Sequence, residues 1–230
     1  MLCKFPILLS FAGATLAQID CTQDVHARLP IIARTHDGVN ASWAQPPSGW
    51  VFGNWKVTWS SSPNYPPLHN FNVDLSPIFP QTPDNIYQLH DLSTYQINGT
   101  RDLTIYYGVD NKRADDSGIY NFTLPRGGLN YRLEILVWGY DTDGVGYKVT
   151  YENEAPEIQA PAALSIESRV ATGPTQETVS KILAEVKKLG WKPLVALAEK
   201  MIPLTHDDGR KGLEYVCDAT CTGAEDPCSA

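Results

Sequence analysis

The sequence predicts an all-β fold: an eight-stranded antiparallel up-and-down barrel with a C-terminal α-helix packed on its wall. Eight segments alternate between apolar and polar residues and are separated by turn signals, as in strands that bury one face. After position 169 the apolar spacing changes to that of an amphipathic helix. Eight antiparallel strands close into a barrel just wide enough to hold one small ligand.

The first residues are predicted to be a signal peptide, covering residues 1–17. Lys4 gives a positive start, residues 5–16 are mostly apolar, and Thr15-Leu16-Ala17 offers small residues at a cleavage site. The apolar run is too short for a bilayer, which requires about 20 helical residues. We therefore expect a secreted, extracellular protein. Prolines and glycines interrupt residues 18–52, which predicts an irregular segment before the barrel.

The barrel strands are predicted from alternation, and the proposed interior is rich in aromatic residues. The expected strands cover about 54–60, 70–76, 86–97, 101–109, 118–124, 129–140, 145–152 and 162–169. A glycan on Asn121 would point outward, which turns its neighbours Tyr120 and Phe122 inward. The candidates for lining a ligand cavity are Trp59, Tyr87, Tyr95, Tyr107, Tyr120, Phe122, Tyr131 and Tyr147. The alternative is that these side chains fill a closed, dry core.

Helical spacing follows the last strand. Val179, Ile182 and Val186 recur at helical intervals, Pro174 suits the first turn and Gly190 suits the end, so one helix is expected over about 174–189. The barrel and this helix together make up a predicted unit of residues 53–190. Residues 191–230 are expected to hold a second short helix, about 193–202, and a cysteine-containing tail.

Cysteine and asparagine positions fit an oxidising, extracellular compartment. After loss of the signal peptide an even number of cysteines remains, which predicts two disulfide bonds of undetermined pairing among Cys21, Cys217, Cys221 and Cys228. Their spacing lacks a nearby histidine to complete a zinc site, so no metal is expected. Three N-x-[ST] sequons make Asn40, Asn98 and Asn121 candidate glycosylation sites.

Charge and motifs narrow the class of function. The formal net charge is −8, and no basic stripe occurs, which disfavours nucleic acid as a partner. No segment after the signal peptide could form a transmembrane helix. The sequence contains no G-x-S-x-G, H-E-x-x-H, P-loop or dinucleotide fingerprint, and no cofactor is expected.

Three separated positions resemble the lipocalin pattern: Gly53-x-Trp55 opening the first strand, Thr142-Asp143 in a late turn, and a lone Arg169 closing the last strand. The resemblance covers about residues 53–190. It implies that Trp55 plugs the closed end of the barrel while Arg169 packs across its indole ring, so that these residues stabilise the barrel and do not contact ligand. A second pattern consists of Trp55 followed by Ser60-Ser61 and Pro63-Asn64, then Trp138-Gly139-Tyr140 and Gly144-Val145 before a strand that ends in tyrosine. It is similar to the lipocalin domain of violaxanthin de-epoxidase, without the cysteine-rich domain of that enzyme.

The resemblance implies a secreted protein that binds or carries a small hydrophobic molecule in its barrel. A second hypothesis is a lipocalin-fold enzyme with isomerase-like or de-epoxidase-like acid–base chemistry, for which Asp91 is the acidic residue in the inward phase of its strand. By the same alternation, Glu134 and Glu152 are expected to face outward. A third hypothesis is an interaction protein with a filled barrel that uses its loops.

Overall fold

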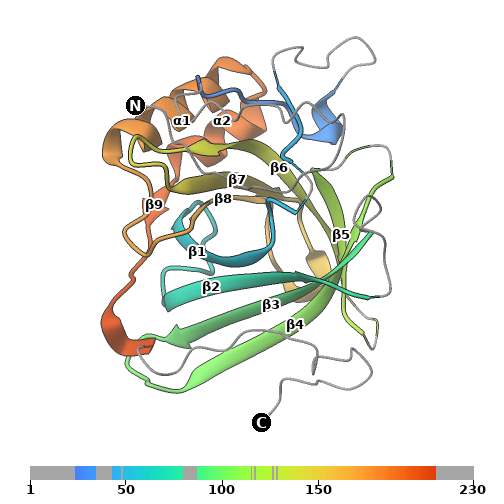
Figure 1. Ribbon diagram of the computed structural model, residues 1–230, viewed down its shortest axis with the longest axis vertical. Helices are drawn as coiled ribbons and strands as arrows, with labels where there is room; N and C mark the ends of the chain where they lie inside the picture. Colours follow the sequence, from blue (N-terminus) through green and yellow to red (C-terminus); the bar gives the residue numbers. More distant parts are fainter. Residues whose placement is uncertain are drawn as a thin grey trace, which may run out of the picture.

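The computed structural model is an antiparallel barrel with two helices against one wall (Figure 1). It describes residues 24–34, 43–47, 49–79, 87–114, 116, 118–125, 127 and 129–210. The barrel strands are β1 (Gly53–Ser60), β2 (Leu68–Pro77), β3 (Gln88–Ile97), β4 (Leu103–Lys112), β5 (Ile119–Thr123), β6 (Asn130–Tyr140), β7 (Gly146–Glu152) and β8 (Ala163–Ser168).

The barrel closes because β1 pairs with β8 on one side and with β2 on the other. Each neighbouring pair from β2 to β8 is antiparallel and consecutive in sequence. A two-residue strand, β9 (Ile202–Pro203), adds to the outer end of β1. The predicted eight-stranded up-and-down barrel is confirmed.

The outer wall formed by β6, β7 and β8 is covered by α1 (Gln176–Lys188) and α2 (Lys192–Glu199) (Figure 1). The apolar faces of the helices pack on outward side chains of the barrel. The fully buried members of this cluster from the helices are Val179, Ile182, Val186 and Leu194. The predicted C-terminal helix on the barrel wall is therefore confirmed. Three 3₁₀ turns complete the described elements: η1 (Ile31–Ala33), η2 (Pro156–Ile158) and η3 (Asp208–Arg210).

Asp141, at the end of β6, joins the first turn of α1 to the barrel. Its carboxylate accepts hydrogen bonds from the Thr178 hydroxyl at 2.6 Å and the Thr175 hydroxyl at 3.0 Å, and from the Thr175 backbone N–H. Thr175 in turn caps the helix by accepting from the Thr178 backbone N–H. The neighbouring Thr142 and Asp143 lie in the β6–β7 turn, where Asp143 accepts from the Val145 backbone N–H at 3.1 Å.

One end of the barrel is closed by Trp55, which is fully buried. The Arg169 guanidinium carbon lies 3.5 Å from the centroid of the Trp55 ring, and the guanidinium donates to the carbonyls of Trp50 at 2.6 Å and Asn54 at 3.1 Å. Burial lowers the pKa of Arg169 to about 10. Gly53 has φ of +92°, and a Cβ atom there would lie 3.3 Å from the guanidinium, so this turn favours glycine.

Trp59 lies outside the barrel, contrary to the sequence prediction. The register between β1 and β8 shifts between Val57 and Trp59, which is the mark of a β-bulge. A bulge reverses the facing of the residues beyond it. Val57 therefore points into the barrel, whereas Trp59 packs against the cluster under α1 and α2.

Tyr147 and Tyr107 also face outward, and the prediction was wrong for both strands. On β7 the apolar set that includes Tyr147 packs beneath the helices, because that wall is covered by protein on its outer side. On β4, Tyr107 packs beside Leu92 on the outer face and forms a 2.7 Å hydrogen bond with His90. Tyr87 precedes β3 and is 45% exposed.

Several predictions concern residues outside the described part of the chain: the signal peptide, Asn40, and the cysteines Cys21, Cys217, Cys221 and Cys228. Asn98 and Asn121 are both exposed. Within the described ranges, no helix has the length and apolar character needed to cross a membrane.

Candidate functional site

The barrel contains two connected chambers. The inner chamber, of about 60 Å³, lies toward the Trp55 end and is bounded by Val51, Val57 and Leu75. The outer chamber, of about 310 Å³, lies at the opposite end, where residues 61–67 and 153–161 form the rim. Five residues line both chambers and mark their junction: Tyr65, Phe71, Ser93, Tyr131 and Glu152.

The outer chamber is lined largely by aromatic rings. Phe71 lies edge-on to Tyr65 and Tyr95, with ring centroids 5.0 and 5.6 Å apart. Tyr106 and Tyr131 complete the aromatic wall, and Ile158 of η2 contributes from the rim. Such a wall offers apolar area together with phenol hydroxyls that can orient a ligand.

A glycine on β4 makes room for the ring that supports this wall. Phe122 stacks between Tyr106 and Tyr131, with centroid separations of 5.9 and 4.7 Å. A Cβ atom on Gly108 would lie 2.1 Å from the tip of the Phe122 ring. Gly108 therefore allows Phe122 to lie across β4 and hold the two tyrosines in place.

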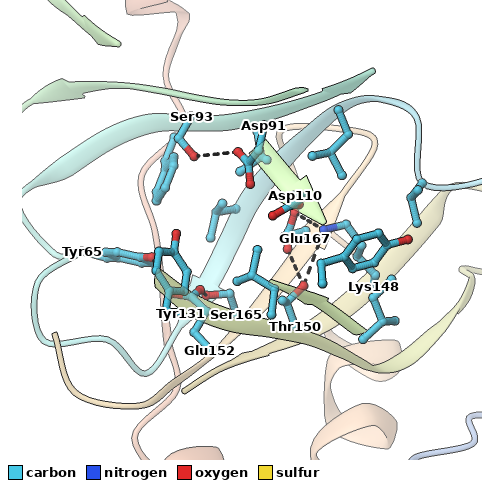
Figure 2. A pocket seen from close by; sticks show the side chains of 18 residues that line it. Tyr65, Asp91, Ser93, Asp110, Tyr131, Lys148, Thr150, Glu152, Ser165 and Glu167 are labelled. Carbon is cyan, nitrogen blue, oxygen red and sulfur yellow. Dashed lines mark hydrogen bonds and ion pairs between the residues drawn. The ribbon is translucent and has the colours of Figure 1, made fainter. Parts of the chain in front are cut away.

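The wall of the inner chamber carries charged side chains among apolar ones (Figure 2). Four acidic side chains and one basic side chain from four strands point into it: Asp91 on β3, Asp110 on β4, Lys148 and Glu152 on β7, and Glu167 on β8. Buried charges are costly unless they are paired or neutralised, so the arrangement of their protons and partners defines this site.

Lys148 and Glu167 form a buried ion pair. The Lys148 ammonium lies 2.5 Å from one carboxylate oxygen of Glu167, and the Thr150 hydroxyl donates to the other oxygen at 2.6 Å. The side chains of Lys148 and Glu167 are each 6% exposed. The two charges therefore offset each other within the chamber, which leaves the remaining carboxyl groups without a basic partner of their own.

Asp91 and Asp110 form a carboxyl pair on the neighbouring wall. The two carboxyl groups lie close enough to shift each other's pKa, and the Ser93 hydroxyl lies 3.5 Å from Asp91. Burial, followed by the charge of Asp110, raises the pKa of Asp91 well above its usual range, and burial raises the pKa of Asp110 to about 7. Burial thus favours the protonated form of both carboxyl groups. The other oxygen of Asp110, Oδ1, is buried and has no hydrogen-bond donor within the described residues.

Glu152 stands at the junction of the chambers. It accepts hydrogen bonds from the Tyr65 hydroxyl at 2.9 Å and the Ser165 hydroxyl at 3.2 Å. Burial raises the pKa of Glu152 to about 7. Burial and the nearby charge of Glu152 raise the pKa of Tyr65, which keeps the phenol in its hydrogen-donating form.

Some of the residues predicted to line a cavity do face the barrel interior. Tyr120 lines the inner chamber, Tyr95 the outer chamber and Tyr131 both, while Phe122 lies behind two lining tyrosines; their role in ligand binding stays a prediction. Asp91 points inward as expected. Glu152 also points inward, where the sequence analysis placed it outside.

Three further charged residues of the chamber were missed: Asp110, Lys148 and Glu167. Asp110 was placed in a loop, whereas β4 continues to Lys112. The signal was present in the alternation of Lys148, Thr150 and Glu152, which all share one face of β7. In the described part of the chain, no group of three or more His, Cys, Asp or Glu residues is arranged to hold a metal ion.

Strand order and end closure together decide the fold. Eight antiparallel strands close in sequential order, a helix packs on the wall, and Arg169 covers Trp55 at the closed end. The chain has the lipocalin fold. The first-strand tryptophan and last-strand arginine that carry the resemblance meet at one end of this lipocalin barrel, and the chambers occupy its interior.

Comparisons with known proteins give one curated relative and several solved structures. "Botcinic acid biosynthesis cluster B protein 12" of Botryotinia fuckeliana is 27% identical over 186 residues, which cover 76% of this chain and 82% of that protein. The cockroach allergen Per a 4 is 11% identical with a TM-score of 0.48 and covers 72% of this chain and 94% of its own. The bovine lipocalin allergen Bos d 2 is 14% identical with a TM-score of 0.42, over 66% of this chain and 89% of its own. No family model matches the sequence.

Proposed function

We propose that the protein binds a small molecule that has an apolar body and a polar head group. The observation that carries this proposal is the pairing of two unlike chambers: an aromatic one of about 310 Å³ at the open end, and one of about 60 Å³ beneath it whose wall holds a cluster of charged side chains. The body of the ligand would occupy the outer chamber, and its head group would reach the carboxyl groups below.

The dimensions support a ligand of one or two rings or a comparable chain. A dry cavity of about 150 Å³ already accommodates benzene, so the outer chamber has room for a larger body. Burial against tyrosine and phenylalanine rings would supply most of the affinity, at about 25 cal/mol per Å² of apolar surface. The polar head would restore hydrogen bonds to groups that lose water when the chamber is filled.

The first test is a search for a copurified ligand together with titration of a neutral probe. Protein purified without denaturant from its native source is extracted and the extract analysed by mass spectrometry. The recombinant protein is titrated with the neutral, polarity-sensitive fluorophore prodan. We expect a bound small molecule or a saturable rise in prodan fluorescence. If neither is observed, the binding proposal fails.

A matched pair of variants tests the location of the ligand. Ser93 lines both chambers, so Ser93→Phe should fill the junction and abolish probe binding. Ser180 lies exposed on α1, so Ser180→Phe makes the same chemical change away from the cavity and should leave binding unchanged. Equal effects of the two substitutions would contradict binding inside the barrel.

Acid–base chemistry on the bound molecule is a second candidate function. The Asp91–Asp110 pair and Glu152 favour it, because burial raises the pKa of Asp110 and Glu152 to about 7, where a carboxyl group can both donate and accept a proton. The test is to incubate the extracted ligand with fresh protein and with Asp110→Asn, and to follow isomer formation by chromatography. If the wild-type protein converts the ligand and Asp110→Asn does not, the protein is an enzyme. If neither protein changes the ligand, the result supports a carrier.

The curated relative is named for a biosynthesis cluster, which supports a role for this chain also in handling a biosynthetic small molecule.

We further propose that the protein is secreted, because residues 1–17 have the features of a signal peptide. Disulfide bonds and glycans are expected for a secreted protein. Expression in a secreting eukaryotic host followed by N-terminal sequencing of the medium protein tests this proposal. A mature N-terminus at Gln18 supports it, and retention of the intact N-terminus inside the cell contradicts it.

A further inference from the structure

The inner chamber holds an excess of acidic groups over basic groups. Among the lining residues that the structure describes, Lys148 is the one basic side chain, and it is paired with Glu167 at 2.5 Å. Asp91, Asp110 and Glu152 remain without a basic partner in either chamber. A carboxylate or phosphate head group would therefore meet net repulsion here, and a cationic head group would meet net attraction.

One acceptor in this chamber lacks a donor. Asp110 is 2% exposed, lines the inner chamber, and its Oδ1 atom has no hydrogen-bond partner within the described residues. No hydrogen bond to the other oxygen is found within the described residues either, although Asp91 lies nearby. A buried carboxylate without donors is costly, so a ligand that brings an N–H or O–H group to this carboxylate lowers the penalty.

We propose that the head group is a protonated primary or secondary amine, seated against the Asp110 carboxylate with the apolar body of the ligand in the outer chamber. This inference rests on the binding function proposed above and names the class of ligand. An inner chamber of about 60 Å³ accommodates a compact ammonium group but not a second ring. The tyrosine faces of the outer chamber also favour a cation on its way inward.

Proton release on binding is an independent test for an amine ligand. The charged or titratable groups that face Asp110 come from every wall of the chamber; they are Tyr65, Asp91, Tyr120, Tyr131, Lys148, Glu152 and Glu167. Burial keeps protons on the carboxyl groups of this set, since it raises the pKa of Asp110 and Glu152 to about 7. An incoming ammonium stabilises their ionised forms, so binding of an amine near pH 7 should release protons to the buffer.

The test uses three probes with one indole body and different head groups: tryptamine, tryptophol and indole-3-acetate. Titration calorimetry at pH 7 measures each Kd, and repeating it in phosphate and in Tris measures proton exchange. We expect tryptamine to bind at least about tenfold more tightly than tryptophol, as one charge-assisted hydrogen bond allows. We expect indole-3-acetate to bind most weakly, and proton release to accompany tryptamine alone.

Two matched variants test whether the preference for the amine depends on Asp110. Asp110→Asn should reduce the advantage of tryptamine over tryptophol to less than about threefold while leaving the Kd of tryptophol unchanged. Asp102→Asn makes the same change at an exposed position and should alter neither. Thermal melting confirms that each variant is folded. If Asp110→Asn does not fold, proton release by the wild-type protein decides the question.

The outcomes separate this inference from the binding function on which it rests. The amine assignment is overturned if tryptophol binds as tightly as tryptamine, or if tryptamine binds without proton release. In either case the barrel still binds a small molecule, so the binding proposal stands. An amine preference that survives Asp110→Asn also overturns it. If none of the three probes binds and prodan does not bind either, both proposals fail together.

Discussion

Removing the Arg169 side chain should destabilise the barrel without abolishing binding in its cavity. Arg169→Ala removes the cation from the face of Trp55, worth about 1 kcal/mol. It also removes hydrogen bonds to the Trp50 and Asn54 carbonyls, worth about 1 kcal/mol each. The sum is about 3 kcal/mol, which lowers the melting temperature of a chain of this size by about 6–12 °C. Arg169 lines neither chamber, so we expect the Kd for prodan to change by less than about threefold.

The measurement is thermal unfolding by circular dichroism, paired with prodan titration well below the melting transition. Lys181→Ala is the control: Lys181 is 58% exposed on α1 and pairs with exposed Glu177 there, so its loss should leave the melting temperature nearly unchanged. A variant at Arg169 that melts with the wild type but no longer binds the probe would refute the reasoning, since it would make Arg169 part of the ligand site.

Three further predictions concern the chamber walls and the helix. Gly108→Ala should displace the Phe122 ring, which would lie 2.1 Å from the new Cβ atom, and cost about 1–3 kcal/mol; unchanged melting and prodan binding would contradict this packing. Asp141→Ala should cost about 1–2 kcal/mol and speed hydrogen exchange in the first turn of α1, because it removes the acceptor that holds the helix cap; unchanged exchange would argue against that role. Burial raises the pKa of Asp110 and Glu152 to about 7, so the folded protein binds more protons than the unfolded chain and its stability should fall as pH rises from about 4 to about 7. Melting at a series of pH values checks this, and the Asp110→Asn, Glu152→Gln double variant should flatten the curve; an equally steep curve would assign the dependence to other groups.

Local patterning was enough to predict the strands and helices. Alternation does not depend on what covers each face, so the eight strands, α1 and α2 were located to within a few residues. The least accurate strand was β4, because Asp110 and Asn111 are turn-forming residue types. In the structure they continue the ladder opposite β5, where Asp110 pairs with Phe122 and Asn111 with Asn121. Tertiary pairing overrode the local preference.

The facing of each strand could not be taken from alternation alone. Period two identifies two faces but does not say which is inside. The usual rule assigns the apolar face to the interior, and it failed on β7, where Tyr147 and Val149 pack under the helices while Lys148 and Thr150 face the chamber. On β1 a bulge also reverses the facing of the residues beyond it, and nothing in the local sequence predicts a bulge there.

The same failure of the rule is informative about function. A barrel that only needed a stable core would place apolar side chains on its inner face and avoid the cost of burying Asp91, Asp110 and the Lys148–Glu167 pair. Ion pairs of this kind contribute little net stability compared with apolar residues of similar volume. Their presence beside an open aromatic chamber is therefore better explained by binding of a polar group in the interior than by stability of the barrel. Replacing Lys148 and Glu167 together by Met and Leu tests this directly. We expect the double variant to melt at or above the wild-type temperature and to bind the three indole probes with altered affinities, while tryptamine still binds more tightly than tryptophol because Asp110 is unchanged; a double variant that unfolds would instead show that the pair is needed for the barrel itself.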